Sequence, residues 1–115
     1  MADKRGPNVL IFFAEQHRGD CLSSAGHSVL MTPNIDHIGG EGTRFTSAYS
    51  TCPICVPARR SLLSGQTPFT HGARNNVITE WNIRNTLPTV LGENGYQTAW
   101  IGRSIHQHPP QKKFG

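Results

Sequence analysis

The sequence predicts an α/β fold in which helices flank a mostly parallel central sheet. Two apolar segments, residues 8–14 and 96–101, are rich in β-forming side chains, and polar residues follow each of them directly. Between these segments, two threonines precede proline-containing runs, which is the pattern of a capped helix. Alternation of strands and helices along a chain is typical of α/β domains.

The first elements in chain order are a tail and a buried strand. Residues 1–7 predict a short tail, and the continuous apolar run 8–14 predicts a strand covered on both faces. Glu15 and Gln16 come directly after this strand. Functional groups collect just past the carboxyl ends of strands in open α/β sheets, so we treat both residues as candidate site residues.

The remaining elements follow from turn and capping signals. In order, they are a helix that Thr32 caps and that ends at residues 39–42, a strand at 44–49, a mixed loop at 66–86, a helix that starts at Thr86 and closes at Gly95, and the strand at 96–101. Arg103 and His106 follow this last strand as polar residues. The second apolar strand thus ends in polar residues, as the first one does.

The stretch from Cys55 to Gly65 predicts a helix with a reactive residue at its start. Pro57 suits a first helical turn, and Gly65 is a C-terminal stop. Free N–H groups and the helix dipole at an N-terminus favour an anion, and Arg59 lies one turn further on the same face. A tetrahedral oxyanion such as sulfate or phosphate would fit there. Arg60, one position further round the helix, is expected to face solvent.

The residues around Cys55 also allow a different chemistry. Cys52-Pro-Ile-Cys55 is a Cys-x-x-Cys pattern, which can be redox-active or form half of a zinc site. The three cysteines are an odd number and do not make a disulfide framework. From the residues alone, both a reactive and a structural Cys55 remain open.

Composition limits the classes of partner. The chain has 115 residues, enough for one small domain, and a net charge of +4 from scattered basic residues. No basic stripe is interleaved with aromatic residues, so we expect no nucleic-acid partner. The longest apolar run, 9–14, is too short to span a bilayer, and no signal peptide is visible. We therefore expect no membrane partner and a cytoplasmic location.

Several segments together resemble a known family. Cys-Val-Pro-Ala-Arg, followed by Arg-Ser-Leu-Leu-Ser-Gly, resembles the signature of type I (formylglycine-dependent) sulfatases of the alkaline-phosphatase-like superfamily. Further segments follow the family pattern in the same order: 7–11, 32–36, 40–45, 48–49, 71–72, 87–91 and 95–99. The resemblance implies an alkaline-phosphatase-like α/β fold. In that fold, residues 8–115 would be the N-terminal part of the catalytic domain, with no complete second domain.

The resemblance also implies roles for the candidate residues. Cys55 resembles the precursor of formylglycine, the nucleophile of the family, and Arg59 resembles the arginine that steadies its hydrated form. Glu15 and Gln16, together with residue 55, match the position of ligands for one divalent cation, Ca²⁺. Glu15 departs from the family pattern, which has an aspartate there.

Arg103 and His106 resemble the family's Gly-Lys-x-His segment, with arginine in place of lysine and the histidine one residue later. They are expected to contact sulfate or the leaving group.

The implied activity is hydrolysis of a sulfate ester of a small molecule or glycan, after a maturation enzyme has generated formylglycine. Further metal ligands of the family lie downstream, so we expect the 115 residues to be inactive alone. Two alternatives are a phosphonate or phosphate ester hydrolase of the same superfamily, and a non-catalytic fragment with a Cys-x-x-Cys metal or redox site.

Overall fold

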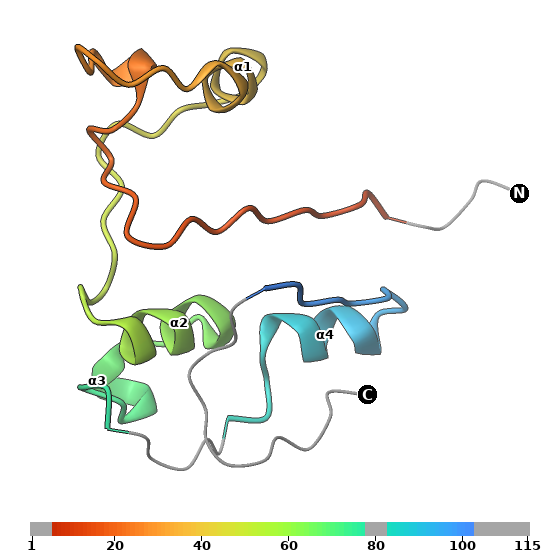
Figure 1. The fold of residues 1–115 in the computed structure, drawn as a ribbon. Helices are drawn as coiled ribbons and strands as arrows, with labels where there is room; N and C mark the ends of the chain where they lie inside the picture. Colours follow the sequence, from red (N-terminus) through yellow and green to blue (C-terminus); the bar gives the residue numbers. More distant parts are fainter. Residues whose placement is uncertain (1–5, 78–82, 103–115) are drawn as a thin grey trace, which may run out of the picture. The chain divides into compact units, whose positions relative to one another are not determined.

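The structure, a computed structural model, describes residues 6–77 and 83–102. The chain divides into two units, Met1–Thr46 and Ser47–Gly115, and each is described by itself (Figure 1). The first contains a short 3₁₀ helix, η1 (Ser23–Ala25), and helix α1 (Pro33–Glu41). The second contains α2 (Cys55–Ser64), α3 (Pro68–His71) and α4 (Leu87–Glu93). Over the described ranges, no helix is both long enough and apolar enough to cross a membrane.

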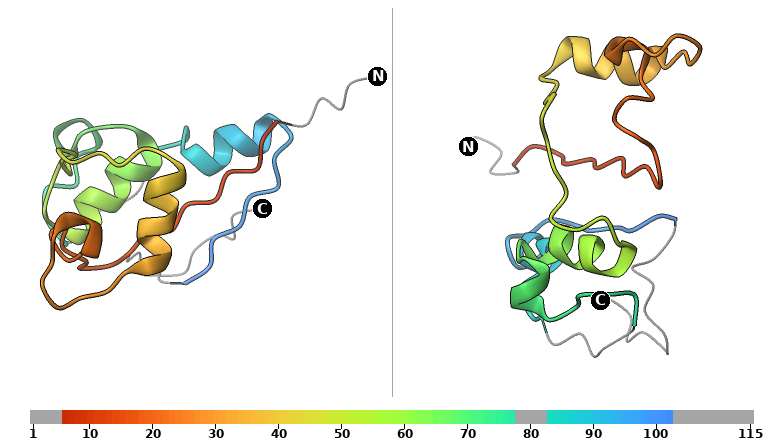
Figure 2. Two further views of the ribbon diagram at one scale, coloured as in Figure 1. Left: turned by 90° about the horizontal axis from the view of Figure 1, so that it is seen from above. Right: turned by 90° about the vertical axis from the view of Figure 1, so that its left-hand side faces the viewer.

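In the first unit, a hydrogen-bonded network joins η1 to α1, which lie against one another in both views of Figure 2. The Asp36 carboxylate accepts from the Ser23 hydroxyl, from the Ser24 N–H at 3.2 Å and from the Thr32 hydroxyl at 3.1 Å. These bonds, that of Ser23 first, lower the pKa of Asp36 to about 2. The network therefore links η1 to α1 through a carboxylate that is charged at neutral pH.

The start of α1 differs in detail from the prediction, whereas its end lies within the predicted range. Thr32 precedes the helix, but its side chain makes no capping bond to a helix N–H. Its hydroxyl instead accepts from the Ser23 N–H at 3.0 Å, so the predicted cap is wrong. The helix continues through Gly39 and Gly40 to Glu41 and ends at Gly42, within the predicted residues 39–42.

In the second unit, α2 packs against both α3 and α4. The buried apolar residues of the described part of the chain are Val56, Pro57, Leu63 and Ala73, and all four belong to this unit. Helix α4 starts as predicted, because the Thr86 hydroxyl accepts from the Thr89 N–H at 3.4 Å. Helix α3 was missed, since it lies inside the predicted loop 66–86, although Thr67-Pro68 carries the same capping signal.

The predicted sheet is not confirmed. The described part of the chain contains no strand; residues 8–14 and 96–101 lack a regular ladder partner, and a turn at 46–47 interrupts the predicted strand 44–49. Their apolar side chains remain largely open, with Phe12 80% and Ile101 96% exposed. A single extended segment cannot bury its two faces without neighbouring strands. The mostly parallel sheet therefore stays a prediction.

Candidate functional site

Cys55 is the first residue of α2, as the sequence predicts. Ile54 precedes the helix in an extended conformation, with φ −111° and ψ 139°, and Pro57 lies in the first turn, where its missing N–H costs no helical hydrogen bond. Gly65 ends the helix in the left-handed conformation at φ 67°, and its N–H donates to the Ser61 carbonyl at 2.8 Å. The helix that carries the reactive side chain is thus defined at both ends.

The two arginines of α2 are both buried. Arg59, four residues after Cys55, is 5% exposed, and Arg60 is 1% exposed. The prediction that Arg60 faces solvent is wrong, because the face that carries Val56 and Leu63 turns inward and Arg60 lies on it. Burial lowers the pKa of the Arg60 guanidinium below its usual value. The guanidinium still stays charged at neutral pH, because an arginine pKa is far above 7.

A serine and a histidine meet beside α2. His71 Nε2 lies 3.1 Å from the Ser61 hydroxyl, and Nδ1 of the same ring accepts from the Ala73 N–H at 3.2 Å. Because Nδ1 accepts, the neutral ring carries its proton on Nε2 and donates it to Ser61. The ring therefore cannot take the serine proton as a general base would. The contacts therefore give His71 a structural role, in which its ring links α2 to the start of the following loop.

Asn76 is a residue of this region that the sequence did not single out. Its side-chain Oδ1 accepts from the Val56 N–H at 3.0 Å. The bond spans 20 positions, so no local pattern could have predicted it. The only signal was Asn75-Asn76 as a turn, which does not reveal what the turn contacts.

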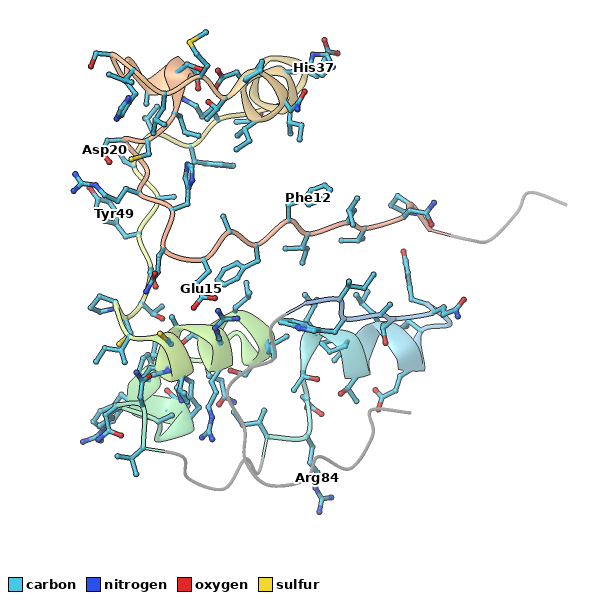
Figure 3. All side chains as sticks on the ribbon, in the orientation of Figure 1. Phe12, Glu15, Asp20, His37, Tyr49 and Arg84 are labelled. Carbon is cyan, nitrogen blue, oxygen red and sulfur yellow. The ribbon has the colours of Figure 1, made fainter. Side chains whose placement is uncertain are left out.

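Glu15 and Gln16 belong to the first unit. Glu15 lies at the end of the extended segment (Figure 3), and Gln16 is the next residue. Gln16 has φ 56°, and no other described residue apart from glycine has a positive φ. Left-handed backbone is unfavourable for such a residue and is found repeatedly at functional sites. Beyond this turn, Arg18 and Asp20 form a two-bond ion pair at 2.9 and 2.6 Å. This pair raises the pKa of Arg18 and lowers that of Asp20.

The predicted site residues are distributed over both units and the last residues of the chain. Cys55 and Arg59 lie one turn apart on α2, whereas Glu15 and Gln16 lie in the other unit. Arg103 and His106 lie outside the described residues. All three cysteines are free thiols. Within the described ranges, no three histidine, cysteine, aspartate or glutamate side chains gather into a metal-binding group.

Comparison with known proteins decides the family. The family model described as Sulfatase matches residues 7–113, nearly the whole chain. The chain belongs to the sulfatase family. Its α/β class follows from this membership, and the matched residues include the helix that begins at Cys55.

Individual sulfatases resemble the chain along most of its length. An arylsulfatase of Clostridium perfringens is 35% identical over 110 residues, which are 95% of this chain and 23% of that protein. An N-acetylglucosamine-6-O-sulfatase of Bacteroides thetaiotaomicron is 32% identical over 101 residues, 88% of this chain and 18% of the relative. Arylsulfatase A of Homo sapiens is 33% identical over 110 residues, which are 90% of this chain and 22% of that protein. No solved structure gave a significant match.

The chain therefore spans about a fifth of the length of the sulfatases it matches. The matched fifth includes the Cys55 helix and the Glu15-Gln16 turn, since the family match covers both. What these residues do in a whole enzyme is a matter for proposal.

Proposed function

We propose that this chain forms the nucleophile-bearing part of a sulfatase that hydrolyses sulfate esters through formylglycine made from Cys55. One observation carries the proposal. Cys55 begins α2 within Cys-Val-Pro-Ala-Arg, and Arg59 follows one turn later, in a chain of the sulfatase family. The proposal includes the mostly parallel sheet, in which residues 8–14 and 96–101 would be strands.

The proposed chemistry uses residue 55 twice. A maturation enzyme, which brings its own oxidant, converts the CH₂SH group of Cys55 to an aldehyde that is then hydrated. One hydroxyl oxygen of the hydrate bonds to the sulfur of the ester, while the bond from sulfur to the alcohol oxygen breaks and the alcohol leaves with a proton. The second hydroxyl then loses its proton as the bond from carbon to the sulfate oxygen breaks, and the aldehyde forms again. A serine in this position would leave a sulfate ester that only water attack could cleave.

The surrounding side chains have distinct proposed roles. Arg59 is held almost completely inside the unit, which suits a charge that steadies residue 55 better than one that reaches out for substrate. Arg103 is proposed to stabilise charge on the sulfuryl oxygens, and His106 to contact the sulfate or the leaving alcohol. A positive charge fixed before reaction stabilises developing negative charge without reorganising at the moment of reaction.

Glu15 and Gln16 are proposed ligands of a divalent cation, together with residue 55. A carboxylate and an amide supply oxygen atoms, and oxygen is the ligand that Ca²⁺ takes in proteins. Both side chains are exposed at a strained turn, so they fit such an ion by donor type and by accessibility. When bound, the cation would supply Lewis-acid activation of the attacking hydroxyl.

The substrate is proposed to be a sulfate ester of a small molecule or a glycan. The relatives include proteins named arylsulfatase and N-acetylglucosamine-6-O-sulfatase, so the alcohol part differs within the family. The shared part is the sulfate group, and that is the part residue 55 would attack.

The direct test is mass spectrometry of the peptide that contains Cys52 and Cys55, from protein produced together with a formylglycine-generating enzyme. We expect the mass loss for conversion of one thiol to an aldehyde, with fragment ions that place it at residue 55. Cys52, in the same peptide, is the internal control and should stay a thiol. A thiol at residue 55 in every molecule would contradict the proposal, and hydrolysis of phosphonate esters in preference to sulfate esters by the mature enzyme would favour the alternative.

A further inference from the structure

Helix α2 begins without a capping side chain of its own. Ile54 stands in the capping position and has no polar side chain, although helices need acceptors for the N–H groups of their first turn. The first bond within the helix runs from the Ala58 N–H to the Ile54 carbonyl at 3.0 Å. Pro57 has no N–H. After Cys55 itself, Val56 is therefore the one first-turn residue whose N–H has no acceptor within the helix.

We propose that Asn76 is a positioning residue that supplies this missing cap and thereby fixes the backbone of residue 55. Its Oδ1 accepts from the Val56 N–H at 3.0 Å, which is good hydrogen-bond geometry. The acceptor comes from a loop 20 positions downstream instead of from the residue before the helix. A side-chain oxygen that bonds the N–H of the second helical residue is what an ordinary N-cap provides.

The loop that presents Asn76 is itself well defined. The Asn75 side chain accepts from the Val77 N–H at 2.9 Å, which closes a turn around Asn76. Five residues earlier, His71 contacts Ser61 further along α2. The loop is therefore anchored to α2 at Ser61 and again at Val56, and it runs back along the helix toward Cys55.

This arrangement has a consequence for residue 55. The peptide unit between Cys55 and Val56 carries the N–H that Asn76 holds, so its orientation is tied to the loop. Loss of the bond would let the first turn fray and would widen the range of directions in which the side chain at 55 points. A nucleophile works best when its direction is set before the substrate arrives. This catalytic consequence rests on the proposed function, whereas the cap itself does not.

The test measures amide hydrogen exchange, residue by residue, in the full chain and in Asn76→Ala and Asn76→Asp. In Asn76→Ala, we expect protection of the Val56 amide to fall roughly 2- to 30-fold, the range that corresponds to loss of a capping side chain. Asn76→Asp keeps the acceptor oxygen and should retain the protection. Gly65, whose N–H bonds to Ser61 at 2.8 Å, reports on the rest of the helix and should not change. Asn85→Ala, an exposed asparagine of the same unit, is the matched control and should leave Val56 unaffected.

A second measurement follows the alkylation of Cys55 by iodoacetamide relative to Cys52. Cys52 lies in a separate turn, where the Ser50 hydroxyl donates to its carbonyl at 2.7 Å. We expect Asn76→Ala to raise the rate ratio of Cys55 to Cys52, because the half-buried thiol becomes more accessible as the first turn frays, and Asn76→Asp to restore it. A general loss of structure would raise both rates and leave the ratio unchanged.

The outcomes separate this inference from the proposed function. Unchanged Val56 protection in Asn76→Ala, or equal losses at Val56 and Gly65, would overturn the positioning role. Neither measurement requires formylglycine, so absence of the aldehyde would contradict the proposed function and leave the cap standing. If the aldehyde forms, its rate of oxime formation with an aminooxy probe should also change in Asn76→Ala and recover in Asn76→Asp.

Discussion

Two adjacent leucines of α2 test which face of the helix is buried. Leu63 is 8% exposed and Leu62 is 38% exposed, so one substitution can be compared at two neighbouring positions. Complete burial of a leucine contributes about 1.5–3 kcal/mol, and an enclosed cavity adds to the loss when the side chain is truncated. We expect Leu63→Ala to lower the free energy of unfolding by about 3 kcal/mol. Leu62→Ala should cost about 1 kcal/mol, because over a third of the side chain already meets water and its removal leaves no enclosed cavity.

The assay is urea unfolding of the two variants and the parent chain, followed by helical circular dichroism. The dependence of the free energy on urea should be the same in all three, so that the midpoints report stability alone. Equal losses in the two variants, or a larger loss in Leu62→Ala, would refute the reasoning. The inward face of α2 would then not be the one that carries Val56, Arg60 and Leu63.

Three further predictions concern single side chains. The pKa of Asp36 is held at about 2, below its ordinary 3.8, so the stabilising effect of its carboxylate is present above pH about 4 and is lost toward pH 2. The thermal midpoint of Asp36→Asn should therefore vary less across this pH window than that of the parent chain. An equally steep profile in both proteins would contradict the network. Gln16→Gly should stabilise its turn by about 1 kcal/mol by relieving the positive φ, measured by amide exchange, while Gln97→Gly, the control without a positive φ, should not stabilise its segment. Arg60→Ala should cost about 2–4 kcal/mol in urea unfolding because a buried stem is removed. Arg74→Ala removes an exposed contact, in which the guanidinium carbon lies 4.9 Å from the centre of the Phe69 ring, and should cost about 0.5–1 kcal/mol. Comparable losses in Arg60→Ala and Arg74→Ala would argue against burial of Arg60.

Local signals predicted the helices well. Cys55 and Gly65 bound α2 as expected, and Thr86 caps α4, because capping and left-handed stops depend on residues within one or two turns. Helix α3 carries the same signal at Thr67 and was missed because its four residues were too few to show a periodic pattern. Cap chemistry alone would have found it.

Features that depend on distant residues could not be predicted in the same way. Position within a helix does not decide whether Arg60 meets solvent or the interior of the unit, because the neighbouring elements decide it. The bond from Val56 to Asn76 likewise needs the loop to return to the helix. The sheet is the largest case, since apolar runs predict that a segment can be a strand, but only a neighbouring strand can complete the ladder. Phe12 is exposed in the structure for this reason.

The first turn of α2 changes how oxyanion binding at this site should be understood. The sequence suggested that free N–H groups at the helix N-terminus, with Arg59, would hold a sulfate. In the structure, Pro57 removes one of these donors and Asn76 occupies the N–H of Val56, while Ala58 already bonds within the helix. Arg59 is also turned inward. The N–H groups of Val56 and Ala58 and the Arg59 guanidinium therefore hold the first turn in place. Recognition of the sulfate should then depend mainly on side chains supplied from outside α2.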